Sequence, residues 1–332
     1  MNTTDPLNTF AQIHFMFSIE IKKEDGFEKI ILKDNNSLTV AAILPECGAI
    51  LHAFEAEKNN ERINVIDSYP SKKEFEEHAE SGGFLGSKLS PFVCRLRNGS
   101  YHFAGKNYKI DGFYLKQHAI HGILYRKPFL VTAQNINDNL ASVTMKYEYG
   151  AEDKGYPFYY DCIVTWQLEK QNLLTVVTEC INKDTVAIPM QDGWHPYFKL
   201  GDQAGELQLQ FQSKEILEFD DDLLPTKKLI QYDAFNSLKK IGDTSFDNCF
   251  TLNRKAAQPL CVLRNAGKKI QIEITPGISY PYLQIYIPPH RQSIAIENLS
   301  GAPDAFNNKM GVLILEPGNS VMFKTTYKIV LH

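Results

Sequence analysis

The sequence has little that would direct the protein to nucleic acids or membranes. Its 332 residues carry a formal net charge of −4 and no long run of Lys or Arg, so nothing indicates a nucleic-acid-binding face. Every stretch long enough to span a membrane contains charged residues, and residues 1–17 show no basic segment followed by an apolar one. We therefore expect a cytoplasmic protein with neither a nucleic-acid nor a membrane partner, in which residues 1–10 form a loose tail.

Closely spaced cysteine pairs are also missing. The chain has six cysteines, none of them in a CxxC pair, which argues against a zinc site or a redox dithiol. Several lie in apolar, strand-like segments, where a free cysteine behaves as a small hydrophobic residue. Reduced thiols are what a cytoplasmic protein is expected to contain. The six are Cys47, Cys94, Cys162, Cys180, Cys249 and Cys261.

The short motifs of the common cofactor and nucleophile sites are absent as well. The chain contains no GxSxG, no phosphate-binding P-loop and no GxGxxG. The spacing of His118 and His121 suits zinc only on a helix or a tight turn, and no third ligand is indicated. We therefore expect no cofactor and no metal.

Strand-like alternation is what the sequence does contain, along most of its length. Apolar residues at every second position predict strands with one buried and one solvent-exposed face. The clearest such segments are 143–149, 164–168, 207–211 and 270–274. Residues 71–80 predict the one convincing helix, with Ser71 as its N-cap, and residues 234–238 are compatible with a helical turn. We predict an all-β protein with very little helix, in which residues 1–332 form one large antiparallel β-sandwich.

Polar side chains beside aromatic ones mark candidate functional positions. His195 stands between Trp194 and Tyr197, shortly after a strand-like segment. Histidine titrates near neutral pH, which suits proton transfer, although a partly buried histidine in an aromatic cluster has the same sequence pattern. Glu297 directly follows the apolar segment 293–296, which places it either at an exposed strand end or in a buried functional position. Aromatic residues near Arg, Asp, Glu and His are typical of a carbohydrate pocket.

These segments together resemble the aldose 1-epimerases, or galactose mutarotase-like proteins, in the same order along nearly the whole chain. The most specific similarity is Gly193-Trp-His-Pro-Tyr-Phe198. The other similar segments are Leu38–Phe54, Ser90–Tyr108, Ile120–Gly122, Gly155–Phe158, Leu224–Thr226, Phe246–Phe250, Ile296–Asn307 and Leu315–Gly318.

The resemblance implies a β-supersandwich with a sugar cleft and a cofactor-free interconversion of the α and β anomers of a free aldohexose. Glu297 would be the general base at O1–H, and His195 the general acid at the ring oxygen. The remaining residues of the site would bind or contact the sugar: His121, Asp247, Arg95, Tyr197 and Trp194. We expect His195 to be protonated while Glu297 is ionised, which gives a bell-shaped pH profile. The partner would be a small sugar, and the protein a monomer or a homodimer.

Two departures from the family pattern leave the preferred sugar open. Cys94 stands where these epimerases usually carry Asn, and Lys227 replaces an expected glycine. A hexose-phosphate mutarotase is an alternative, since Arg95, Arg97 and Arg126 are candidates for contact with a phosphate. A non-catalytic sugar-binding module is another, although the chain has a candidate for each proton-transfer group.

Overall fold

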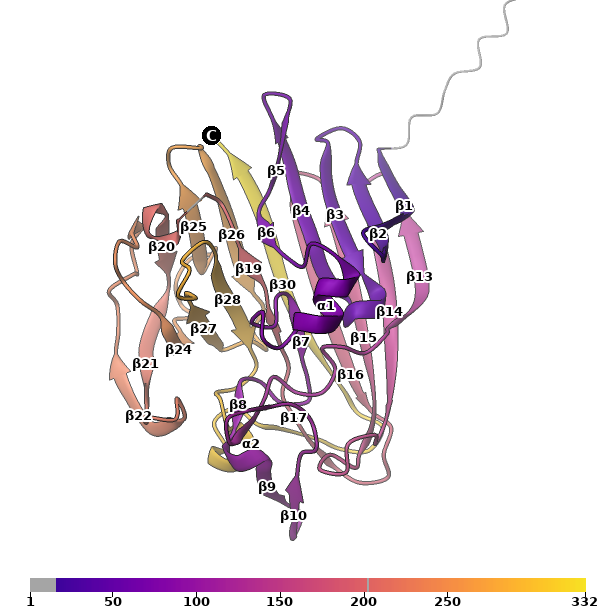
Figure 1. Ribbon diagram of the computed structural model, residues 1–332, viewed down its shortest axis with the longest axis vertical. Coiled ribbons are helices and arrows are strands. Elements are labelled where there is room, and N and C mark those ends of the chain that lie inside the picture. Colours follow the sequence, from indigo (N-terminus) through magenta and orange to yellow (C-terminus); the bar gives the residue numbers. More distant parts are fainter. Residues whose placement is uncertain (1–15, 202) are drawn as a thin grey trace, which may run out of the picture.

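Three large antiparallel sheets make up most of the described chain (Figure 1). The computed structural model describes residues 16–201 and 203–332, so the predicted loose tail at 1–10 lies outside the described residues. Every ladder between named strands in the described part runs antiparallel, and the single parallel pairing is an isolated bridge between Ser90 and Gly122. The prediction of an all-β antiparallel fold is confirmed.

The first sheet has nine strands and contains the longest alternating segments of the sequence. Along β15, for example, Val164, Trp166 and Leu168 are buried while the residues between them are only half-buried. In sheet order its strands are β13 (Leu130–Ile136), β14 (Leu140–Gly150), β15 (Tyr159–Glu169), β16 (Leu173–Asn182), β30 (Ser320–Leu331), β26 (Ile270–Pro276), β25 (Cys261–Asn265), β20 (Gln208–Phe211) and β23 (Lys239–Lys240).

The second sheet is built mainly from the second half of the chain. Its main path is β22 (Pro225–Gln231), β21 (Ser213–Phe219), β24 (Asp247–Leu252), β27 (Tyr282–Tyr286), β28 (Ile294–Leu299), β18 (Gly193–His195) and β7 (Ser87–Leu89). Two short strands extend it, because β19 (Tyr197–Phe198) pairs with both β28 and β6 (Ile66–Asp67).

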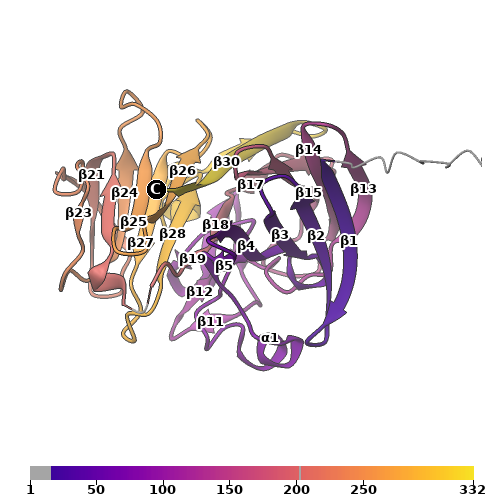
Figure 2. The ribbon, with the colours of Figure 1, turned by 90° about the horizontal axis from the view of Figure 1, so that it is seen from above.

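The third sheet contains β1 (Phe17–Glu24), β2 (Phe27–Asp34), β3 (Thr39–Leu44), β4 (Ile50–Lys58) and β5 (Glu61–Asn64). It packs over the β14 and β15 end of the first sheet, as the indigo and magenta strands of Figure 2 show. The second sheet covers the other end, where the ring of Phe211 lies 4.7 Å from that of Phe250. A continuous cluster of buried apolar side chains lies between these layers.

Short elements accompany the large sheets. They are the three-stranded sheet of β11 (Tyr114–Leu115), β12 (His118–Ile120) and β8 (Arg95–Leu96), the pair β9 (Ser100–Phe103) and β10 (Lys106–Lys109), the pair β17 (Ile188–Met190) and β29 (Leu313–Leu315), and three 3₁₀ turns at Pro45–Cys47, Arg97–Gly99 and Ala204–Glu206.

The helical predictions are partly confirmed. Helix α1 (Lys72–His78) begins after Ser71, whose Oγ accepts the backbone N–H of Glu74 at 3.2 Å. Residues 234–238 form no helix, because the backbone turns there and the Asn236 side chain accepts the N–H of Ser213 instead. A second helix, α2 (Ala305–Asn308), is too short for a periodic pattern to predict. Among the described residues, neither helix is long and apolar enough to cross a membrane.

Candidate active site

A cavity partly open to solvent lies against one face of the second sheet. Its walls come from β24, β27 and β28 on one side and from the segments around β8 and β12 on the other. The cavity brings together six residues that the sequence predicted for the site: Glu297, His195, His121, Asp247, Arg95 and Tyr197.

Strand pairing explains why residues far apart in sequence meet in this cavity. In the register of β27 with its neighbours, Gln284 is opposite Glu297, and Tyr286 is opposite Asp247. Paired residues project from the same face of a sheet, so all four side chains point into the cavity. Gln284 Nε2 also donates to Asp247 Oδ1 at 2.9 Å, which fixes the orientation of that carboxylate.

Gln284 and Tyr286 are cavity residues that the sequence analysis did not identify. They alternate with the buried Leu283, Ile285 and Ile287, so strand periodicity placed them on one polar face. The sequence alone does not tell whether that face meets solvent or a cavity, and only the neighbouring strands decide it.

His195 reaches the cavity because of its place on β18, between β28 and β7. Gly193 pairs with Leu299 of β28, and a Cβ on Gly193 would lie only 2.7 Å from Cδ2 of that leucine. The glycine therefore permits the close approach of the two strands that brings His195 next to Glu297. The Nε2 atom of His195 lies 3.3 Å from Oε1 of Glu297.

Trp194 does not line the cavity, which corrects the expectation that it contacts the sugar. Successive side chains of a strand point to opposite faces, so an inward His195 sends its neighbour into the core. There the indole packs against Trp166, with ring centroids 5.5 Å apart, and its N–H donates to Thr178 Oγ1. We therefore assign Trp194 a role in supporting β18.

Tyr197 and Phe84 hold the two cavity imidazoles in place. The Tyr197 ring stacks on that of His195, with centroids 5.0 Å apart, and its hydroxyl donates to the carbonyl of Gly83. The Phe84 ring meets His121 edge-on at 4.6 Å, and the two imidazole centroids are 4.8 Å apart. Both imidazoles are thus locked by aromatic packing.

The opposite wall is formed by two residues in left-handed backbone conformations, Cys94 (φ 48°) and His121 (φ 62°). The His121 N–H donates to the Cys94 carbonyl at 2.9 Å, which ties the two together. Gly122 follows with φ 73°, and a Cβ there would lie 2.3 Å from the carbonyl oxygen of Ser90. Non-glycine residues in this conformation cost about 1–3 kcal/mol each and cluster at functional sites.

His118 is directed away from the cavity and from His121. Its Nδ1 accepts the backbone N–H of Asn98 at 3.0 Å, and its Nε2 lies 3.5 Å from a carboxylate oxygen of Asp222. The sequence spacing of the two histidines therefore does not translate into a shared ligand set.

Burial controls the protonation of the central pair. Glu297 is 1 % exposed and His195 is 4 % exposed, so both groups favour their neutral forms. Burial, reinforced by Asp247 and opposed by Arg95, raises the pKa of Glu297 well above its usual range. Burial lowers the pKa of His195 to about 3. Without sugar, burial therefore favours a neutral carboxyl group on Glu297 and a neutral imidazole on His195, the reverse of the charge state expected from the sequence.

Four buried polar atoms of cavity residues have no hydrogen-bond partner within the described chain. They are Oε2 of Glu297, Nδ1 of His121, Nδ1 of His195 and Oε1 of Gln284. A buried polar atom left unpaired costs about 1–3 kcal/mol, so atoms of this kind at a cavity wall indicate a ligand with hydroxyl groups.

The three candidate phosphate-binding arginines are separated by the structure. Arg95 lines the cavity, whereas Arg97 forms an ion pair with Asp220 at 2.6 Å. Arg126 donates through Nε to Glu80 Oε1 at 2.6 Å, and its guanidinium lies over the Phe75 ring. Only Arg95 of the three is therefore placed to contact a ligand in the cavity.

Comparison with known proteins gives one consistent result. Residues 28–328 match the family described as aldose 1-epimerase. The Escherichia coli K12 protein YihR, of uncharacterized function, is 27 % identical over 70 % of this chain and 75 % of its own length. An aldose 1-epimerase of Streptococcus thermophilus is 22 % identical over 90 % of this chain and 93 % of its own.

Among solved structures, a galactose mutarotase-like protein from Clostridium acetobutylicum superposes with a TM-score of 0.84 at 16 % identity. That superposition covers 96 % of this chain and 99 % of the other. It confirms the predicted galactose mutarotase-like fold.

Proposed function

Because the chain belongs to the aldose 1-epimerase family, we propose that it interconverts the α and β anomers of a free aldohexose. The observation that carries the proposal is the buried pair of Glu297 and His195, 3.3 Å apart in a cavity that is partly open to solvent. Opening a pyranose ring removes one proton from O1 and delivers one to O5. One carboxylate and one imidazole are sufficient for both transfers.

In the proposed mechanism, Glu297 accepts the O1 proton while His195 donates a proton to the ring oxygen. The C1–O5 bond breaks and an aldehyde forms at C1. Rotation about C1–C2 presents the other face of the aldehyde, and as the ring closes Glu297 returns its proton to O1 while His195 takes back the proton of O5–H. The remote hydroxyls are held by Asp247, Arg95 and His121, so C1 itself stays free to turn.

Sugar binding must first move the resting proton of the pair. In the sugar-free cavity Glu297 carries it, because burial disfavours the carboxylate. Sugar hydroxyls that donate to the carboxylate would stabilise its charged form, since a hydrogen bond to a charged group contributes about 1.5–3 kcal/mol. The proton then passes to Nε2 of His195 over the 3.3 Å contact. The Glu297–His195 pair itself carries one such proton at each stage.

The arrangement of arginines favours a free sugar over a sugar phosphate. A bidentate phosphate site needs guanidinium groups that converge on the ligand. Arg97 and Arg126 are already paired with Asp220 and Glu80, which leaves Arg95 as the single member of the three in the cavity. We therefore propose an uncharged aldohexose as the substrate.

We further propose that the protein works in the cytoplasm, as a monomer or a homodimer. All six cysteines are buried and free of disulfide bonds, as is usual in a reducing compartment. Cell fractionation tests the location and light scattering the oligomeric state; recovery in an oxidising compartment, or a larger assembly, would contradict the proposal.

Polarimetry on freshly dissolved sugars tests the proposed activity and its substrate together. We expect the protein to speed the approach of α-D-glucose or α-D-galactose to anomeric equilibrium, and to act less well on the 6-phosphates. Sugar binding without any acceleration would favour a non-catalytic binding module. Preference for the 6-phosphates would contradict the free-sugar assignment.

A further inference from the structure

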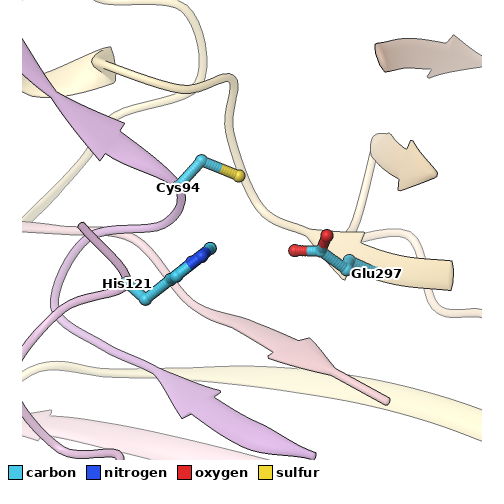
Figure 3. A group of neighbouring side chains, drawn as sticks. All are labelled: Cys94, His121 and Glu297. Carbon is cyan, nitrogen blue, oxygen red and sulfur yellow. The ribbon is translucent and has the colours of Figure 1, made fainter. Parts of the chain in front are cut away.

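The cavity contains a set of metal-ligand side chains that the epimerase reaction does not use together. A sulfur, an imidazole nitrogen and a carboxylate oxygen, from Cys94, His121 and Glu297, all lie within 4.8 Å of one another. Figure 3 shows the three side chains pointing into one shared space, the first two from one wall and Glu297 from the opposite one. From this geometry we propose that Cys94, His121 and Glu297 bind Zn²⁺ in the sugar cavity, so that metal and sugar exclude each other.

The donors are close to the spacing that zinc needs. Zinc bonds of about 2.3 Å to sulfur and 2.0–2.2 Å to nitrogen or oxygen, at tetrahedral angles, place donor atoms about 3.4–3.6 Å apart. The 4.8 Å limit on the donor separations exceeds that spacing by about 1.2–1.4 Å, so the Cys94 and Glu297 side chains must turn toward the packed His121 imidazole for the metal to bind. Water or Nε2 of His195, 3.3 Å from Glu297, would take the fourth position.

The backbone holds the wall that carries two of the ligands. Cys94 and His121 are joined by the hydrogen bond between the His121 N–H and the Cys94 carbonyl, and β8 pairs with β12 directly beside them. Both residues adopt left-handed conformations that cost energy for any residue other than glycine. Preorganisation of this kind fixes ligand directions before the metal arrives.

Independent of the spacing, unpaired atoms indicate a ligand at this point. Oε2 of Glu297 and Nδ1 of His121 have no hydrogen-bond partner within the described residues. The three side chains are 1–7 % exposed, so solvent reaches them poorly. A thiolate, a neutral imidazole and a carboxylate favour Zn²⁺ over Mg²⁺ or Ca²⁺, which prefer oxygen ligands alone.

The charges balance when the metal binds. The Cys94 thiol and the Glu297 carboxyl each lose a proton to solvent as they bond to the metal, because thiol and carboxyl ligands coordinate in their deprotonated forms. One dication, one thiolate and one carboxylate then sum to zero in the buried site. Zinc here would act as an inhibitor and not as a cofactor, since it occupies the general base.

Cobalt(II) provides the direct probe, because a thiolate bound to Co²⁺ produces an intense charge-transfer absorption. The full chain, stripped of metal by a chelator, is titrated with CoCl₂ and then with ZnCl₂, beside Cys94→Ala, Cys94→Ser and the control Cys47→Ala. Cys47 is a comparably buried thiol, 2 % exposed, outside the cavity.

We expect the absorption in the wild type and in Cys47→Ala, its loss on addition of Zn²⁺, and its absence from both Cys94 variants. Loss of even an outer-shell partner weakens metal binding about 10–100-fold, so loss of a ligand should reduce Zn²⁺ affinity at least tenfold. Absorption that persists in the Cys94 variants, or none in the wild type, would overturn the proposal.

The competition between metal and sugar rests on the proposed function and has its own readout. Zn²⁺ should raise the apparent KM for the sugar in the wild type, and at least tenfold more Zn²⁺ should be needed in Cys94→Ala, each compared with its own metal-free rate. Failure of the proposed function would leave a protein that binds cobalt but has no epimerase activity. Cobalt binding together with full activity in saturating Zn²⁺ would contradict the exclusion of sugar by metal.

Discussion

Replacing Lys88 by Met should destabilise the whole protein, because its ammonium group compensates a carboxylate behind the active site. Lys88 and Asp192 form an ion pair in which both side chains are 0 % exposed. The Tyr280 hydroxyl donates to Asp192 at 2.5 Å, and Lys88 Nζ lies 4.6 Å from the centre of the Trp194 ring. Removing one partner of a buried pair leaves an uncompensated charge, which typically costs about 3–5 kcal/mol.

The assay is urea unfolding followed by tryptophan fluorescence, since both tryptophans of the chain, Trp166 and Trp194, are buried side by side. Lys88→Met should lose about 3–5 kcal/mol of unfolding free energy. The double variant Lys88→Met/Asp192→Asn should recover part of it, because the amide is uncharged and still accepts from Tyr280. Lys22→Met, which breaks an exposed pair with Glu24, should leave the unfolding free energy nearly unchanged.

The loss in Lys88→Met should also depend on pH in a defined direction. Burial raises the pKa of Asp192, and Lys88 opposes that rise. Without Lys88 the folded state binds a proton at pH values where the unfolded chain, with a pKa of about 3.9, does not. Stability of the variant therefore increases as the pH falls toward that value, and its deficit is smaller at pH 5 than at pH 8. A deficit below about 1 kcal/mol, or a double variant no more stable than the single one, would refute the reasoning.

Three further predictions concern the site. The plot of kcat/KM against pH should stay flat across neutral pH. The free enzyme gains a proton on His195 only near the pKa of that residue, about 3, and loses the proton of Glu297 only above the raised pKa of that carboxyl. A change in kcat/KM near the ordinary histidine pKa of about 6.5 would contradict this. Asp247→Asn should lower kcat/KM about 10–100-fold, mainly by raising KM in initial-rate assays, since a hydrogen bond to a charged group contributes about 1.5–3 kcal/mol; a change confined to kcat would point to proton transfer instead. Trp194→Phe should reduce the urea midpoint of unfolding while leaving KM nearly unchanged. A large increase in KM would instead indicate that Trp194 contacts the sugar.

The sequence predicted the fold well because the fold depends on period-two alternation. The segments 143–149 and 164–168 lie inside β14 and β15, and Ser71 caps the helix that its pattern indicated. The misassigned segments are short. The turn at 234–238 is decided by a side-chain hydrogen bond of Asn236, and α2 has only four residues.

The site was predictable in its residue types and not in its geometry. Trp194 and His195 are neighbours in sequence, yet strand alternation sends the indole into the core and the imidazole into the cavity. Gln284 enters the site only through its register opposite Glu297. The resting proton was misplaced for a related reason, since burial of both groups is a property of the packed sheets and not of the local sequence.

The central claim is that Glu297 transfers a proton during anomer interconversion, and exchange NMR at equilibrium tests it most directly. The rate of magnetisation transfer between the α and β anomeric protons is measured with the wild type, Glu297→Gln and the control Glu215→Gln. Glu215 lies on β21 of the same sheet, two strands removed from β27 and outside the cavity. Positioned acid–base catalysis contributes about 10²–10⁴-fold, so Glu297→Gln should lose that much of the catalysed rate while Glu215→Gln keeps it. A Glu297→Gln variant that still binds sugar and exchanges the anomers at the wild-type rate would contradict the account.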